Sequence, residues 1–314
     1  MPLRLSYLSL LPLLCMAVPL PEVQKINERP IIGIVAQEVT DEAFVPFGKT
    51  YIADSYVKFL ESAGCRVIPI RLNLTEEEYL RIFKSINGVL FPGGDVDLLA
   101  SSFARTAGIF YRLAVEATSS GNYFPIWGTC MGFQILTSLT SGKDLLVPTS
   151  ASNISLPLNL TYDISSSKMF QHASPELLRV LRRENVTANF HHFGITPEVF
   201  QANEKLSTFY RILSTNRDKS EVEFVSTIEA RNFPIYGVQW HPEVNRFQWR
   251  SDHAYPHSVN AMWISQYTAN FFVNEARKNM NTFSSVQEEE ESLIYNWTPK
   301  YTANISGYEQ AYFF

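Results

Sequence analysis

The sequence predicts an α/β fold in which a mostly parallel central sheet carries helices on both faces. Two observations lead to this fold class. Short β-branched runs, typical of buried parallel strands, alternate along the chain with stretches whose apolar residues recur at helical spacing. The 314-residue chain is also 46% hydrophobic and 18% charged, a composition typical of a globular protein with a sizeable core. Alternating strands and helices indicate right-handed βαβ units, whose strands lie parallel.

The first half of the chain supplies most of these alternating elements. Thr75 and Glu78 have the spacing of a helix capping box, and Gly64 and Gly142 stand where helices are expected to end. Strands are expected within 29–37, 65–70, 87–94 and 123–129, and helices within 50–64, 74–86, 101–120 and 130–142.

The second half shows a less regular pattern. Residues 144–190 are rich in Ser, Asn and Pro and have no clear period. Strand-like runs return at 209–215, 222–230 and 234–243, and residues 259–279 predict a long helix. No convincing linker is present, so we expect one domain over residues 19–279. Residues 280–314, with the acidic run Glu288 to Glu291, are expected to form a solvated tail that wraps the surface.

The N-terminus has the layout of a secretory signal peptide over residues 1–18. Arg4 precedes a leucine-rich run and small residues, with cleavage expected near Ala17 or Val18. The run is shorter than the roughly 20 apolar residues that span a bilayer, and no later segment is apolar enough to be a membrane anchor. The alternative is a buried N-terminal helix. Six Asn-x-Ser/Thr sequons agree with a secreted glycoprotein: Asn73, Asn153, Asn159, Asn185, Asn296 and Asn304.

Charge and cysteine content narrow the possible functions. The formal net charge is −5 without a basic stripe, which argues against a nucleic-acid partner. Once the signal peptide is cleaved, only Cys65 and Cys130 remain, so the core rather than disulfides must stabilise the fold. Cys65 begins a buried strand and is expected to be inert. Cys130 is a candidate free thiol, and we predict no bridge between the two cysteines.

Cys130 lies in a pattern typical of a nucleophile elbow. A strand, the run Gly128 to Gly132 and a helix follow one another, and the glycines leave room where a Cβ would clash. The helix start favours a thiolate at Cys130 and offers the free N–H of Met131 to an oxyanion. The alternative is a buried, inert cysteine between packing glycines.

A general base follows another strand. His241 comes directly after the run 235–240, and Glu243 lies two residues on, where a strand places both side chains on one side. A thiol needs a base, and that base needs an acceptor to orient it. The His-Pro-Glu sequence is weak evidence alone, but beside a Gly-x-Cys-x-Gly elbow it predicts a cysteine hydrolase.

Together, "GTCMGFQ", "VQWHPE" and "FPGG" resemble the class I glutamine amidotransferase family, whose triad is Cys, His and Glu in this chain order. Within that family, the secretory features and segments such as "YIADSYVKFLESAG" and "LIYNWTPKYTANIS" are similar to the γ-glutamyl hydrolases, or folylpolyglutamate hydrolases. No synthetase or ammonia-accepting domain is present, which favours a stand-alone hydrolase. The resemblance implies a flavodoxin-like arrangement of the sheet, a lysosomal and secreted location, and a homodimer.

The resemblance also implies roles for individual residues. Cys130 would be the nucleophile, His241 the general base and then acid, and Glu243 the residue that orients it. The backbone N–H groups of Gly94 and Met131 would form the oxyanion hole. Substrate contacts are expected from His191, Tyr56 and Gly93.

The expected reaction is cleavage of γ-glutamyl bonds in folylpoly-γ-glutamates and antifolate polyglutamates through a γ-glutamyl thioester on Cys130. Glutamate or short polyglutamates would be released, and no cofactor or metal is needed. One alternative is a glutaminase or another γ-glutamyl amidase with the same triad. A more distant one is a secreted binding glycoprotein without catalysis.

Other polar pairs predict no metal site. His191 and His192 are adjacent on an expected strand and would face opposite ways. His253 and His257 flank Pro256 and are expected in a loop. Asp95 and Asp97 are expected to cap the next helix.

Overall fold

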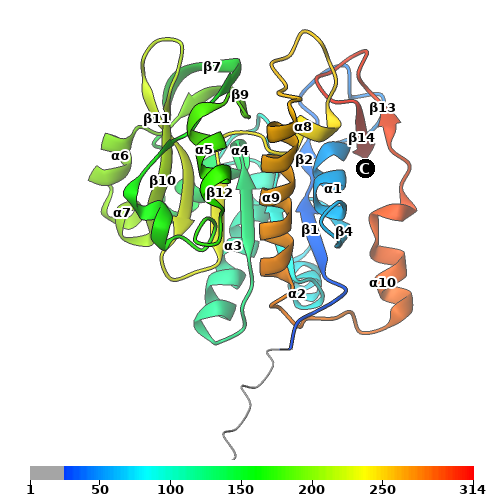
Figure 1. Cartoon of the computed structure of the whole chain (residues 1–314). Coiled ribbons are helices and arrows are strands. Elements are labelled where there is room, and N and C mark those ends of the chain that lie inside the picture. The colour runs from blue at the N-terminus through cyan, green and yellow to red at the C-terminus, as the bar shows by residue number, and fades with distance from the viewer. Residues whose placement is uncertain (1–24) are drawn as a thin grey trace, which may run out of the picture.

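The computed structural model describes residues 25–314, and its central feature is an eight-stranded sheet (Figure 1). Along the sheet the strands follow the order β4 (Arg66–Ile70), β1 (Ile31–Val35), β5 (Gly88–Phe91), β6 (Ile126–Thr129), β12 (Ile235–Val238), β11 (Glu223–Ala230), β10 (Tyr210–Arg217) and β8 (Asn159–Leu160). The first five strands run parallel to one another, and β11, β10 and β8 are each antiparallel to the strand before them in this order. The mostly parallel sheet predicted from the sequence is confirmed.

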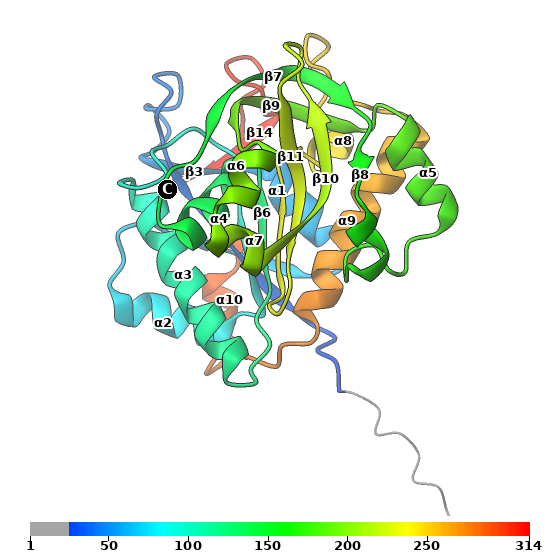
Figure 2. The same cartoon turned by 90° about the vertical axis from the view of Figure 1, so that its left-hand side faces the viewer.

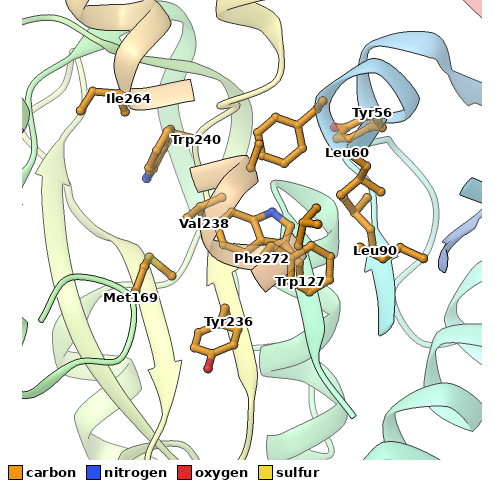
Figure 3. Close-up of a cluster of buried hydrophobic side chains, with 14 of the residues drawn as sticks. Tyr56, Leu60, Leu90, Trp127, Met169, Tyr236, Val238, Trp240, Ile264 and Phe272 are labelled. Carbon is orange, nitrogen blue, oxygen red and sulfur yellow. The ribbon is translucent and has the colours of Figure 1, made fainter. Parts of the chain in front are cut away.

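Helices cover both faces of this sheet, as Figure 2 shows with α3 on one side and α9 on the other. On one face, α1 (Asp54–Glu61) and α9 (Val259–Ala276) pack over one buried apolar cluster. On the other, α2 (Glu76–Ser85), α3 (Ser102–Ser119) and α4 (Met131–Ser141) pack over a second. Successive residues of β1 point into opposite clusters, because side chains alternate along a strand. Figure 3 shows Tyr56, Trp127 and Phe272 within the first cluster.

The predicted helix ends are largely confirmed. The Thr75 hydroxyl accepts from the Glu78 N–H at 3.2 Å, and the Thr75 N–H donates to the Glu78 carboxylate at 2.8 Å, which is the capping box read from the sequence. Gly142 ends α4 in the left-handed region, at φ 74°. Residues 50–53 correct a prediction, because they form strand β3 (Thr50–Ala53) and the helix begins only at Asp54.

The unpatterned segment 144–190 contains a long antiparallel ribbon. β7 (Val147–Leu156) pairs with β9 (Thr187–Gly194) above one end of the main sheet (Figure 2). Shorter helices complete this half: Tyr162–Ser166 (a 3₁₀ turn), α5 (Pro175–Arg183), α6 (Pro197–Ala202), α7 (Glu204–Phe209) and α8 (Val244–Phe247).

The C-terminal tail runs along the surface (Figure 1), but it is less solvated than expected. It contains α10 (Val286–Ser292), a 3₁₀ turn (Ile294–Asn296), β13 (Lys300–Tyr301) and β14 (Gln310–Phe313). β13, β14, β3 and β2 (Gln37–Glu38) form a four-stranded antiparallel sheet. Within the acidic run, Glu290 and Glu291 are exposed, whereas Glu289 pairs with Arg66.

None of the helices found in residues 25–314 is long and apolar enough to cross a membrane. The expected signal peptide, residues 1–18, lies outside the described part of the chain.

Candidate active site

Cys130 stands at a sharp turn between β6 and α4. Its backbone has φ 54° and ψ −109°, a conformation that is uncommon for a residue with a side chain. The Cys130 N–H donates to the Val238 carbonyl at 2.8 Å, and the Cys130 carbonyl accepts from the Gln134 N–H at 3.0 Å. The surrounding strand and helix therefore hold the elbow in a strained geometry, as is common at functional sites.

The two flanking glycines are required by space. A Cβ on Gly128 would overlap the carbonyl of Gly132, and a Cβ on Gly132 would overlap the carbonyl of Phe91. Both obstacles are backbone atoms, which cannot rotate away. The structure thus gives the physical reason for the Gly-x-Cys-x-Gly pattern.

His241 and Glu243 form a buried pair at the end of β12. The His241 N–H donates to the Ala188 carbonyl of β9 at 2.9 Å, which fixes the backbone. Its Nδ1 lies 2.7 Å from Glu243 Oε1, and Glu243 is 1% exposed. Burial opposes charge on the imidazole, but the Glu243 carboxylate and Cys130 outweigh that effect and raise the pKa of His241.

Cys130 and His241 converge at Gly93. A Cβ built on Gly93 would lie 2.8 Å from His241 Cε1 and 3.2 Å from Cys130 Cβ. With Nδ1 held by Glu243, the Nε2 atom of His241 is buried and has no hydrogen-bond partner among residues 25–314. Segments more than a hundred residues apart thus bring a thiol and an imidazole to one point.

The backbone that follows β5, at Gly93 and Gly94, borders the site of Cys130 and His241. The Gly93 N–H donates to the Tyr56 hydroxyl at 2.8 Å, and the Gly93 carbonyl accepts from Gln37 Nε2 at 2.7 Å. A Cβ on Gly94 would lie 2.9 Å from Met131 Cε, so the two expected oxyanion residues are neighbours. Met131 is the first residue of α4, whose leading amides have no acceptor within the helix.

Tyr56 lies deeper than a substrate-contact residue would. It is 1% exposed, and its hydroxyl lies 3.4 Å from His241 Nδ1 while accepting from Gly93. Burial raises its pKa well above the ordinary value, so the group stays a neutral phenol. Tyr56 therefore links the imidazole to the glycine segment.

His191 is also buried, at 3% exposure, and both ring nitrogens have partners in the protein. Nδ1 lies 2.9 Å from the Phe193 carbonyl and 3.1 Å from the Thr149 hydroxyl, and Nε2 lies 3.3 Å from Asn189 Oδ1. Burial lowers its pKa to about 3, which keeps the ring neutral. Its expected contact with substrate stays a prediction.

Sequence reasoning missed several residues around the site. The ring of Phe190 lies 5.9 Å from that of His241 and also contacts Tyr255. Burial raises the pKa of Tyr308, in the tail, to about 12, with further contributions from Cys130 and Glu243, so this residue lies near the triad. Gln37 was missed as well. No local pattern marks these residues, because each approaches the site from a distant segment.

The two histidine pairs lie as expected, whereas the expected aspartate cap is wrong. His191 is buried and His192 exposed, so they face opposite ways, and His253 and His257 lie in a loop. Asp97 accepts from the N–H groups of Leu99 and Ala100 in the turn before α3, but Ser101 rather than an aspartate caps the helix.

The described residues contain neither a candidate metal cluster nor a disulfide. Residues 25–314 hold no cluster of three or more His, Cys, Asp or Glu that could bind a metal ion. Cys65 and Cys130 are both free thiols, and burial raises the pKa of Cys65.

Comparison with known proteins places the chain in a family. The model of the peptidase C26 family matches residues 30–243, which include Cys130, His241 and Glu243. The human protein named gamma-glutamyl hydrolase is 49% identical over 91% of this chain and 90% of its own length. The chain belongs to the peptidase C26 family.

Two further proteins are similar to this chain. Gamma-glutamyl hydrolase B of Dictyostelium discoideum is 40% identical over 93% of this chain and 85% of its own length. Among solved structures, the glutaminase domain of Trypanosoma brucei CTPS, with bound acivicin, matches at a TM-score of 0.51 and 14% identity. That match covers 80% of this chain and 95% of the solved one, and it supports the glutamine amidotransferase-like fold of this C26 member.

Proposed function

We propose that this protein is a cysteine hydrolase that cleaves γ-glutamyl bonds. The observation that carries the proposal is the convergence of the strained Cys130 and the His241–Glu243 pair beside Gly93. The substrate class is supported by membership of the peptidase C26 family and by relatives named gamma-glutamyl hydrolase.

Acylation begins when Cys130 Sγ attacks the γ-glutamyl carbonyl carbon, its proton residing on His241 Nε2. The carbonyl oxygen becomes an oxyanion, which the N–H groups of Gly94 and Met131 stabilise, each such donor contributing about 10²–10³ in rate. The C–N bond then breaks, and His241 gives its proton to the leaving amine. A γ-glutamyl thioester remains on Cys130.

Deacylation repeats these roles with water as the nucleophile. His241 Nε2 takes a proton from water, the hydroxide oxygen bonds to the thioester carbon, and the C–S bond breaks. The acid product leaves and loses its proton to solvent as a carboxylate, and the Cys130 thiolate and protonated His241 are restored. Glu243 keeps Nδ1 protonated and Nε2 directed at the sulfur throughout. Buried groups of the protein supply every step, so the mechanism requires no cofactor.

Folylpoly-γ-glutamates and antifolate polyglutamates are the substrates we assign, with glutamate or short polyglutamates as products. We assign substrate contacts to His191, Tyr56 and Gly93. Of these, Gly93 and Tyr56 lie against His241, and Tyr56 acts by positioning. The alternative substrate is free glutamine or another γ-glutamyl amide, since the same triad and oxyanion donors would serve it.

We further propose a lysosomal and secreted glycoprotein that forms a homodimer. Secretion and glycosylation are supported by the signal-peptide layout of the first 18 residues and the exposure of all six sequon asparagines. The lysosomal location and the homodimer follow from the resemblance to the γ-glutamyl hydrolases. Enzymatic removal of N-glycans followed by mass measurement, and light scattering of the secreted product, test these points.

Product analysis of a defined folate pentaglutamate tests the activity. The unmodified protein should release glutamate or short polyglutamates, detected by mass spectrometry, and free glutamine should be a poor substrate. Cys130→Ala should bind the pentaglutamate but leave it intact. Preferred hydrolysis of glutamine would favour the alternative, and substantial turnover by Cys130→Ala would exclude the thioester mechanism.

A further inference from the structure

Gln37 is a buried glutamine whose side-chain amide hydrogen-bonds to a backbone carbonyl, that of Gly93, close to Cys130. It lies on the short strand β2, is 1% exposed, and donates from Nε2 to the Gly93 carbonyl at 2.7 Å. We propose that Gln37 is a positioning residue for the γ-glutamyl hydrolysis: it orients the Gly93–Gly94 peptide so that the Gly94 N–H faces the developing oxyanion. This inference rests on the proposed function.

The geometry of the peptide bond carries the first step. In a trans peptide the carbonyl of one residue and the N–H of the next point in opposite directions. The bond from Gln37 fixes the direction of the Gly93 carbonyl and therefore also fixes the Gly94 N–H, which points away from Gln37. Among residues 25–314 the Gly94 N–H finds no hydrogen-bond acceptor, so it stays free for a ligand.

Tyr56 holds the N–H group of Gly93, the residue whose carbonyl is bound by Gln37. The Gly93 N–H donates to the Tyr56 hydroxyl, so it is already engaged and cannot also serve an oxyanion. With the N–H and the carbonyl of Gly93 both fixed, rotation of the next peptide is restricted. Of the N–H groups of Gly93 and Gly94, only that of Gly94 therefore remains available to form the oxyanion hole together with the N–H group of Met131.

The contact with Gly94 is close. A Cβ on Gly94 would overlap Gln37 Oε1, so the glutamine amide lies directly against this residue and a side chain there would displace it. Glu38, the next residue of β2, accepts from the Ser102 N–H at 2.6 Å at the start of α3. β2 therefore holds both ends of the segment 92–101 that contains the proposed oxyanion donor.

Gln37→Met tests the proposal, because methionine fills similar space without an N–H donor. We expect kcat for a γ-glutamyl peptide to fall about 10- to 100-fold, since a misdirected donor costs nearly as much as a missing one. KM should change little. The rate at which iodoacetamide alkylates Cys130 should be unchanged, because alkylation forms no oxyanion.

Gln266→Met is the matched control. Gln266 is half-buried on α9 and also donates to a backbone carbonyl, that of Ser62, at 3.3 Å, but far from the segment 92–101 in the chain. It should keep the kcat of the unmodified protein. Thermal unfolding of each variant checks that it is folded. Should Gln37→Met not fold, Gln37→Asn, which keeps a buried amide but shortens its reach, carries the same test.

Two results would overturn the positioning role: an unchanged kcat in the folded variant, or a parallel loss of kcat and alkylation rate, which would mean general damage to the site. Failure of the proposed function itself looks different. In that case the unmodified protein would not cleave the γ-glutamyl peptide, or Cys130→Ala would still cleave it, whatever Gln37→Met does.

Discussion

The charge state of the site depends on single side chains and their neighbours. Glu243 is nearly fully buried and contacts His241 Nδ1, so its carboxylate acts on the imidazole with little screening by water. That carboxylate favours the imidazolium form, which donates to the leaving amine. Within residues 25–314 no carboxylate hydrogen-bonds to His191, and burial outweighs the attraction of Asp218 and keeps the ring neutral. The pKa values of these two buried histidines are thus shifted in opposite directions, that of His241 upward and that of His191 downward.

Glu243→Gln should lower both kcat and the pKa of His241. The amide fills the same space, but it removes the negative charge that raises the pKa, so burial then dominates and the pKa moves down. The alkaline limb of the kcat profile, where His241 loses its proton, should therefore shift to lower pH. We expect kcat to fall by about 10²–10⁴ at its optimum. A pH–rate profile measures both effects, and an unshifted alkaline limb would contradict this electrostatic role.

His191→Gln should make the protein less sensitive to acid. The folded-state pKa of His191 is about 3, below the ordinary value near 6.5, so its contribution to stability is complete above pH 6.5 and is lost as the pH falls toward 3. Between pH 6.5 and 5 this linkage removes up to about 2 kcal/mol. The fall in Tm between pH 7 and pH 5 should be smaller in the variant. His192→Gln, at an exposed neighbouring position, should keep the full fall.

At the scale of elements, the turn at Cys130 depends on close contact between the backbones of α4 and β5. α4 approaches β5 so closely that Gly132 meets the Phe91 carbonyl, which brings Met131 next to Gly94. Gly132→Ala should therefore force α4 away from the sheet and destabilise the fold by about 1–3 kcal/mol or more. Gly108→Ala on α3 is the control, because its Cβ would meet only the tip of Leu139 at 3.3 Å and alanine favours a helix by about 0.5–1 kcal/mol. Calorimetry of both variants would measure the difference, and equal Tm values would contradict the close approach.

The predictable elements are those with local signals. The capping box at Thr75, the left-handed Gly142 and the elbow at Cys130 each follow from a few adjacent residues, and all three are present. Residues 50–53 were misjudged because their strand forms by pairing with β2 and β14, and β14 lies about 260 residues away. Gln37 escaped for the same reason, since its partner is Gly93. Sequence periodicity contains no information about such distant partners.

Over the whole molecule, the chain end supports the active site. β14 pairs with β3, β3 pairs with β2, and β2 holds the Gly93 carbonyl through Gln37. Tyr308, just before β14, lies near the triad. The tail is therefore expected to affect catalysis as well as stability, although β14 lies some 70 residues beyond the end of the peptidase C26 match.

Ala311→Glu tests this dependence. Ala311 is fully buried against Phe44 and Tyr51, and a carboxylate there without a partner would cost several kcal/mol, so β14 should detach from β3. We expect a lower Tm and, at temperatures where the variant remains folded, a kcat reduced about ten-fold or more because β2 no longer holds the segment 92–101 firmly. Tyr301→Glu adds the same charge to the tail at a side chain that is 65% exposed, and it should change neither quantity. Retention of full kcat by Ala311→Glu, with Tm lowered, would show that the tail stabilises the fold without positioning the site.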